Sequence, residues 1–156
     1  MRIALCICPQ WSVQTPSFAI GSLKSHIKNK DVEVEQFDLN IRTSLYTKEK
    51  NIQKFWDWGN DTPWNSEANF KDEILPNFKD LWHEYIDKLA EYDVVAFTTY
   101  ISNIVTTDYI ARYLKQKNPK IQIWYGGPYS WYAESAGLVA VSYTNLRAHE
   151  TRTHLV

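Results

Sequence analysis

The chain has 156 residues, about the size of one domain, and its 44% hydrophobic and 22% charged residues exclude collagen-like and disordered classes. Its 17 basic and 18 acidic residues give a net charge of −1, which provides no electrostatic attraction to nucleic acid or to an anionic membrane. The apolar run from Ile3 to Cys8 is too short for a signal sequence or a transmembrane helix. The two cysteines, Cys6 and Cys8, do not make a disulfide framework, so we expect a cytoplasmic protein.

The first part of the chain alternates between strand and helix patterns. Arg2 to Cys8 is a short apolar run ended by a proline, which is typical of a buried strand. Phe18 to Lys28 has apolar residues at helical spacing, and Ser17 is its candidate N-cap. Val32 to Phe37 alternates apolar and polar residues, which predicts an edge strand with one wetter face.

The second part of the chain repeats this alternation. Asp93 to Thr98 has the pattern of another buried strand. Ile104 to Leu114 has helical spacing, and either Ser102 or Asn103 is in place to cap it. Ile121 to Tyr125 is the fourth predicted strand.

A long insertion, from about residue 41 to residue 92, separates the two parts. Apolar residues recur every three or four positions in its second half, which predicts a helix that Pro76 should kink or restart. Its first half, Phe55 to Asn65, holds three tryptophans among turn residues. Two interpretations stay open for them: packing of the insertion onto the sheet, or an interaction surface presented by a flavodoxin-like scaffold.

Strands that alternate with helices predict an α/β fold, a doubly wound parallel sheet of the flavodoxin or Rossmann kind. Four strands are expected and the fifth is expected to be missing, with a further helix starting in Ser130 to Leu138. Ligands of such sheets bind beyond the carboxyl ends of the strands. Those ends are Pro9 to Pro16, Asp38 to Asn40, Thr98 to Asn103, and Gly126 to Ser130.

Several chemistries lack the residues that they need. Cys6 and Cys8 share one face of a strand, but no further ligands accompany them, so we predict two small buried hydrophobes rather than a metal site. No G-x-G-x-x-G or P-loop follows the first strand, which disfavours classical nucleotide binding. A flavin- or nucleotide-binding domain stays open as an alternative, with Ser12, Thr15 and Ser17 as its candidates for a phosphate nest.

Four stretches carry a resemblance when they are taken in order: CICPQWSVQTPSFAIGSLKSHIK, VEVEQFDLNI, DVVAFTTYISNI and NPKIQIWYGGPYS. Together they resemble the N-terminal cobalamin-binding domains of cobalamin-dependent radical S-adenosylmethionine (SAM) enzymes. The resemblance covers residues 1 to about 138 apart from the insertion. It depends on the order of the four stretches, because none of them is specific alone.

This resemblance implies a flavodoxin-like domain that holds cobalamin at the carboxyl edge of the sheet. It places Thr98 against the nucleotide tail, the backbone of Gly126 and Gly127 along the cleft of the tail, and Asp38 and Asn40 at the rim. The loop from Pro9 to Pro16 would face the corrin. The candidate cofactor-binding residues are Gln10, Thr15, Pro16, Asp38, Asn40, Thr98, Thr99, Tyr100, Gly126, Gly127 and Pro128.

Two departures from the family pattern limit what this chain is expected to do. The branch that resembles methionine synthase has Asp-x-His-x-x-Gly in the first loop, whose histidine ligates cobalt, and this sequence has no histidine there. It also lacks the Cys-x-x-x-Cys-x-x-Cys pattern of the iron–sulfur cluster. The resemblance therefore assigns the cluster and SAM to a downstream domain of the parent chain, and we expect no catalysis from this fragment alone.

The C-terminal stretch has a different character. Ala140 to Thr151, AVSYTNLRAHET, resembles the conceptual translation of a sequencing adapter. We therefore expect a cobalamin-binding-like domain in residues 1–139 and a non-native tail in residues 140–156, at the position where the fifth strand of the sheet should fall.

Overall fold

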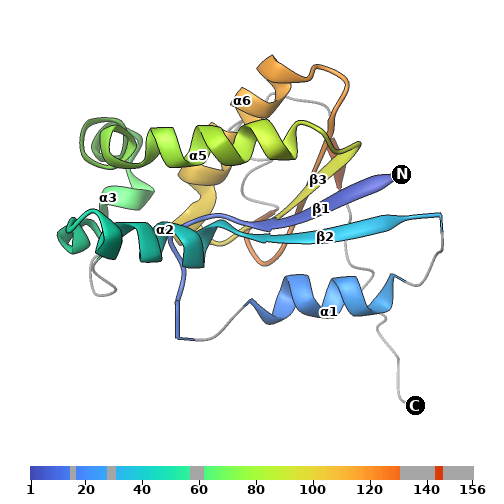
Figure 1. Cartoon of the computed structure of the whole chain (residues 1–156), viewed down its shortest axis with the longest axis horizontal. Coiled ribbons are helices and arrows are strands. Elements are labelled where there is room, and N and C mark those ends of the chain that lie inside the picture. Colours follow the sequence, from blue (N-terminus) through green and yellow to red (C-terminus); the bar gives the residue numbers. More distant parts are fainter. Residues whose placement is uncertain (15–16, 28–30, 57–61, 131–142, 146–156) are drawn as a thin grey trace, which may run out of the picture.

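The computed structural model describes residues 1–14, 17–27, 31–56, 62–130 and 143–145. These residues form an α/β fold around one sheet in which the strand order is β2-β1-β3-β4-β5 and every paired strand is parallel (Figure 1). This architecture confirms the predicted flavodoxin-like, doubly wound class. The strands are β1 (Arg2–Ile7), β2 (Glu33–Asp38), β3 (Val94–Thr98), β4 (Gln122–Gly126) and β5 (Tyr143–Asn145).

Besides the four predicted strands, the sheet has a short fifth strand at its edge. β5 pairs in parallel with β4, with Ile123 opposite Tyr143. Its three residues are too short a run to give a strand signal in the sequence, because alternation needs about four residues or more to be recognised. The helix predicted from Ser130 onward lies outside the described residues.

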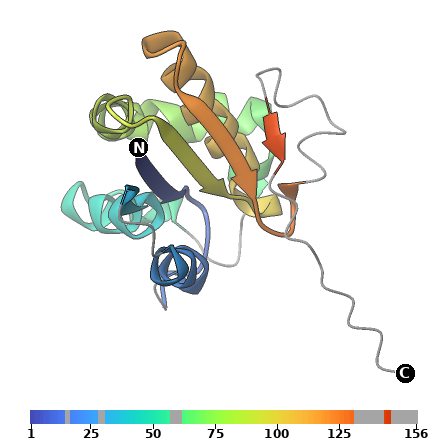
Figure 2. The same ribbon diagram turned by 90° about the vertical axis from the view of Figure 1, so that its right-hand side faces the viewer.

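The helices cover the two faces of the sheet unequally (Figures 1 and 2). The step from β1 to β2 runs in one direction along the sheet, and the steps from β2 to β3 and from β3 to β4 run in the other. Right-handed crossovers therefore place the first helix on one face and the later helices on the opposite face. The first is α1 (Phe18–His26), and the later ones are α2 (Leu39–Glu49), α5 (Leu75–Leu89) and α6 (Ile104–Lys117).

Each face of the sheet has its own hydrophobic core because successive strand residues point to opposite sides. On the side of α1, the core is small and consists of Ile3, Leu5, Ile7, Ile20 and Val94. The core on the side of α5 and α6 is larger, and it includes Ala4, Cys6, Cys8, Leu39, Phe78, Trp82, Val95, Phe97, Ile110 and Ile123.

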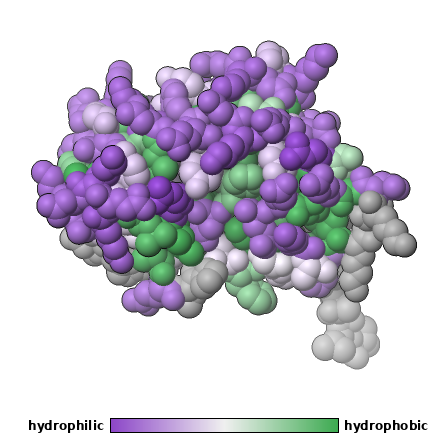
Figure 3. Space-filling view, viewed as in Figure 1, coloured by the Kyte–Doolittle hydropathy of each residue, from purple (hydrophilic) through white to green (hydrophobic). Residues whose placement is uncertain are grey.

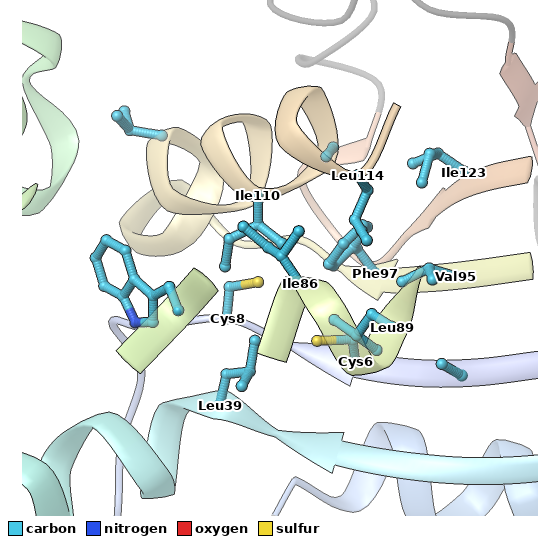
Figure 4. Packing of buried hydrophobic residues seen from close by; sticks show 14 of the residues in the cluster. Cys6, Cys8, Leu39, Ile86, Leu89, Val95, Phe97, Ile110, Leu114 and Ile123 are labelled. Atoms are coloured by element: carbon cyan, nitrogen blue, oxygen red, sulfur yellow. The ribbon is translucent and has the colours of Figure 1, made fainter. Parts of the chain in front are cut away.

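The two cysteines belong to this larger core. Cys6 and Cys8 are free thiols, fully buried among residues such as Leu39, Ile86 and Leu89 (Figure 4). Burial raises the pKa of the Cys6 thiol well above its usual range, and the neighbouring Cys8 raises it further. Both cysteines therefore act as small hydrophobes, as the sequence predicted.

The insertion is helical, as its periodicity predicted. A π-helical segment leads directly into α5, and Pro76 lies in the first turn of that helix, where its missing N–H costs nothing. Of the two predicted effects of Pro76, a kink or a restart of the helix, the structure shows the restart, because α5 begins at Leu75. The segments before α5 are η1 (Gln53–Phe55), α3 (Thr62–Asn65), α4 (Glu67–Asn69) and η2 (Phe70–Ile74).

Two tryptophans of the insertion lie in the larger hydrophobic core. Trp64 and Trp82 are fully buried, Trp64 Nε1 donates to the carbonyl of Phe55 at 3.2 Å, and Trp82 Nε1 donates to Thr43 Oγ1 at 3.0 Å. These two indoles therefore pack the core and do not form an exposed interaction surface. Trp58, the remaining tryptophan of the 55–65 segment besides the half-buried Trp56, lies outside the described residues.

The surface seen in Figure 3 is mainly hydrophilic, with small separate apolar areas. Among the described residues, every helix is too short or too polar to cross a membrane.

Candidate functional site

The loop after β1 is tied to the strands on both sides of it. The Trp11 N–H donates to Asn40 Oδ1 at 2.8 Å, and Asn40 Nδ2 donates to the carbonyl of Ser12 at 3.2 Å. On the other side, the Gln10 N–H donates to the Ser102 carbonyl at 3.3 Å, and Ser102 Oγ donates to the Gln10 carbonyl at 2.6 Å. The position of this loop is therefore fixed by side chains that follow β2 and β3.

The side chain of Asn103 links the carboxyl ends of β1 and β3. Its buried Nδ2 donates to the carbonyls of Cys8, at 3.3 Å, and Thr98, at 3.1 Å, while Oδ1 accepts from the Tyr100 N–H at 2.8 Å. The sequence predicted that Ser102 or Asn103 would cap α6. Asn103 does occupy the N-cap position, but its side chain makes these three bonds in place of a cap.

Asp38 is the N-cap of α2. Its Oδ1 accepts from the Ile41 N–H at 2.8 Å, which satisfies one of the free donors of the first helical turn. Burial raises the pKa of this carboxyl, and backbone hydrogen bonds oppose that rise. Asp38 and Asn40 were both predicted to lie at the rim of the site. In the structure the Asp38 side chain caps α2, and the Asn40 side chain bonds to the loop after β1.

The two glycines at the end of β4 differ in the space that a side chain would have. Gly127 has a φ of 97°, and a Cβ there would lie 2.8 Å from the carbonyl oxygen of Thr99. A Cβ on Gly126 would meet nothing within 4 Å. The Gly126 carbonyl accepts from the Thr99 N–H at 2.7 Å and from Thr99 Oγ1 at 2.8 Å, which closes the backbones of the two strand ends on each other. The fold therefore requires a glycine at 127, while Gly126 leaves room for a ligand.

The open space at Gly126 is part of a cavity of about 420 Å³ between α1 and the ends of β3 and β4. This volume lies within the range of small-molecule sites. Among the described residues, no charged side chain lines it. Its lining is Leu5, Ala19, Ile20, Leu23, Ala96, Phe97, Thr98, Tyr100, Trp124, Tyr125, Gly126, Gly127 and Pro128.

The predicted site residues divide into three groups. Those that line the cavity are Thr98, Tyr100, Gly126, Gly127 and Pro128. Those that hold the loops or the strand ends around it are Gln10, Asn40 and Thr99, and Asp38 caps α2. Thr15 and Pro16 lie outside the described residues.

Sequence reasoning missed the apolar wall of the cavity. Leu5, Ala96 and Trp124 lie in one row across β1, β3 and β4, because Leu5 pairs with Ala96 and Ala96 with Trp124. Strand parity was the available signal, since residues at matching positions in parallel strands share a face. The register itself is not visible in the sequence.

An aromatic pair stands beside this cavity. The rings of Trp11 and Tyr100 are stacked, with centroids 3.9 Å apart and an interplanar angle of 14°. The pair joins the loop after β1 to the loop after β3.

A second cavity, of about 490 Å³, lies on the opposite face of the sheet between η2 and α6. It contains the ion pair of Arg112 Nε and Asp108 Oδ2, 2.6 Å apart, but none of the predicted site residues. Within the described ranges, no group of three or more His, Cys, Asp or Glu side chains is placed to hold a metal ion.

Comparisons with known proteins give no relative: no family model, no curated protein and no solved structure matches the chain. A function must therefore be argued from the residues and the geometry of this chain.

Proposed function

We propose that this domain binds cobalamin at the carboxyl edge of its sheet, with the nucleotide tail in the 420 Å³ cavity. The observation that carries the proposal is the open space at Gly126, where the family resemblance expects the backbone to line the tail. Thr98, the hydroxyl that the resemblance assigns to the tail, lines the same cavity.

The chemistry of the cavity wall favours binding of an aromatic ring of a ligand over binding of a phosphate group. The polar side-chain groups of the described lining are the hydroxyls of Thr98 and Tyr100 and the indole N–H of Trp124, which has no hydrogen-bond partner among the described residues. Desolvation costs a neutral aromatic base little free energy when it leaves water for such a wall, whereas it costs a phosphate with no cation beside it much more. The base of the cobalamin tail therefore suits this space better than the phosphates of a free nucleotide.

The first loop would face the corrin without ligating cobalt. Asn40 and Ser102 hold residues 10–12 in place, and no histidine occurs between residues 9 and 16. When bound, cobalamin would supply the methyl-transfer or carbon-skeleton chemistry of its parent enzyme. In this proposal a downstream radical SAM domain carries the iron–sulfur cluster and SAM, while this domain binds and orients the corrin in the cytoplasm.

The test is retention of the cofactor. Purified protein is mixed with hydroxocobalamin and desalted, and its visible spectrum is recorded; we expect corrin absorbance to stay with the protein. Gly126→Leu should abolish retention because the new side chain fills space that the fold leaves empty. The matched control is Gly21→Leu, which adds the same side chain at an exposed position of α1. Absence of corrin from the wild-type protein, or equal retention by both variants, would overturn the proposal.

A flavin is the second candidate, because its ring also suits an uncharged aromatic cavity. Its phosphate finds little in the described part of the first loop, where Ser12 Oγ already accepts from the Gln14 N–H at 3.3 Å. The same desalting experiment with flavin mononucleotide distinguishes the two, since retained flavin absorbs and fluoresces differently from a corrin.

A further inference from the structure

We propose that Tyr100, supported by Trp11, makes the cavity selective for a two-ring aromatic base over a one-ring base. This inference rests on the proposed corrinoid function, and it identifies which corrinoids the site accepts. It depends on the placement of three aromatic side chains around the cavity.

The first observation is that Tyr100 contacts both Trp11 and the cavity. Tyr100 lines the cavity and Trp11 does not, yet the two rings are stacked at 3.9 Å. Because the indole covers one face of the Tyr100 ring, the phenol cannot rotate away from the cavity without losing this contact.

The second observation is that both backbones of the pair are fixed. The Tyr100 N–H donates to Asn103 Oδ1, and the Trp11 N–H donates to Asn40 Oδ1, each at 2.8 Å. A stacking surface that is already held in place loses little conformational entropy when a ligand arrives.

The third observation is the extent of the aromatic lining. Trp124 lines the same cavity from the neighbouring strand β4, and Ala96, which pairs with it, leaves space between β1 and β4. A ligand ring in this cavity therefore lies among aromatic and small apolar side chains. Its binding depends on stacking area, which is larger for benzimidazole or a purine than for a phenol.

The experiment compares three corrinoids: cobalamin, a cobamide whose lower base is a phenol, and cobinamide, which has no base. We expect the wild-type protein to bind cobalamin about two- to tenfold more tightly than the phenolic cobamide, as one additional stacked ring implies. Cobinamide should bind weakest. Equal affinity for cobalamin and the phenolic cobamide would overturn the selectivity.

Variants assign this preference to the aromatic pair. Tyr100→Leu and Trp11→Leu should remove it, while Tyr100→Phe, which keeps the ring, should retain it. The matched control is Tyr113→Leu on the exposed surface of α6. The preference is a ratio of two affinities, so a general loss of folded protein does not alter it, and a preference that survives both leucine variants would contradict the proposal.

A second measurement separates failure of this inference from failure of the proposed function. 5,6-Dimethylbenzimidazole alone is added to the protein at a pH where the base is neutral, and its binding is followed by saturation-transfer NMR. A signal that Tyr100→Leu abolishes supports the ring site even if cobalamin is not retained. Two outcomes would overturn the role of Tyr100 while leaving the corrinoid function intact. In both, the protein retains cobalamin; in one the free base gives no signal, and in the other the signal of the free base is unchanged by Tyr100→Leu.

Discussion

Gln10 and Ser102 exchange two hydrogen bonds across the carboxyl edge of the sheet, so the loop after β1 and the loop after β3 behave as one unit. Asn103 adds hydrogen bonds to the carbonyls of Cys8 and Thr98, at the ends of the same two strands. The loops at this edge are therefore preorganised. A site of this kind needs little rearrangement of its loops to bind a ligand.

Replacement of Asn103 tests this unit directly. Asn103→Ala leaves the buried carbonyls of Cys8 and Thr98 and the Tyr100 N–H without these partners. We expect a loss of about 2–4 kcal/mol in the free energy of unfolding, because each unpaired buried group is costly. Urea denaturation measures it, with Asn77→Ala as the control, since Asn77 makes a single bond on the exposed surface of α5. Equal stability of the two variants would contradict the role of Asn103.

The two glycines after β4 should respond differently to alanine. Gly127→Ala forces a Cβ against the Thr99 carbonyl at a positive φ, so we expect a loss of about 1–3 kcal/mol. Gly126→Ala should change stability by less than about 0.5 kcal/mol, because its Cβ meets open space. Thermal melts of both proteins make the comparison, and a larger effect at Gly126 would refute the assignment of open space to that position.

The threonines of the interior offer a test of buried hydrogen bonds. Thr43→Val removes the acceptor of the Trp82 indole N–H and leaves that donor buried, which should cost about 1–3 kcal/mol. Thr106→Val is the control, because the buried Thr106 Oγ1 has no hydrogen-bond partner among the described residues. This second variant should be neutral or stabilising. Chemical denaturation distinguishes them, and equal losses would show that the Thr43 bond contributes nothing.

Tyr92 should make the fold sensitive to alkali. Burial raises the pKa of its phenol to about 12, and a hydrogen bond with Glu35 adds to the rise. The folded state holds this proton more tightly than the unfolded chain, so the contribution is fully present below the ordinary tyrosine pKa. It is lost as the pH rises from about 10 to about 12, with a slope of at most about 1.4 kcal/mol per pH unit.

Tyr92→Phe isolates this contribution from those of other titrating groups. We expect its unfolding free energy to fall less steeply with pH over that interval than that of the wild-type protein. Urea titrations at successive pH values provide the measurement. Parallel curves for the two proteins would rule out Tyr92 as the source.

Local patterns predicted those parts of the molecule that local forces determine. The alternation in Val32 to Phe37 indicated an edge strand, and β2 does lie at the edge of the sheet. Pro76 was expected to kink or restart a helix, and it lies in the first turn of α5.

Features that depend on register and long-range contact were not predictable in this way. Asn103 bonds to Cys8 through a contact that no local pattern encodes. The row of Leu5, Ala96 and Trp124 required the register of three strands. The three-residue β5 is too short for its pairing with β4 to be visible in the sequence.

The unequal covering of the sheet has a mechanical consequence. The helices on the face of α5 and α6 bury many side chains, whereas α1 buries only Ile20 completely, and its N-cap Ser17 makes no side-chain bond to it. The wall formed by α1 is therefore held by fewer buried side chains than the opposite face of the sheet. In the proposed complex, ligands that differ in thickness should displace this one helix, while the glycines and aromatic rings opposite it keep their positions.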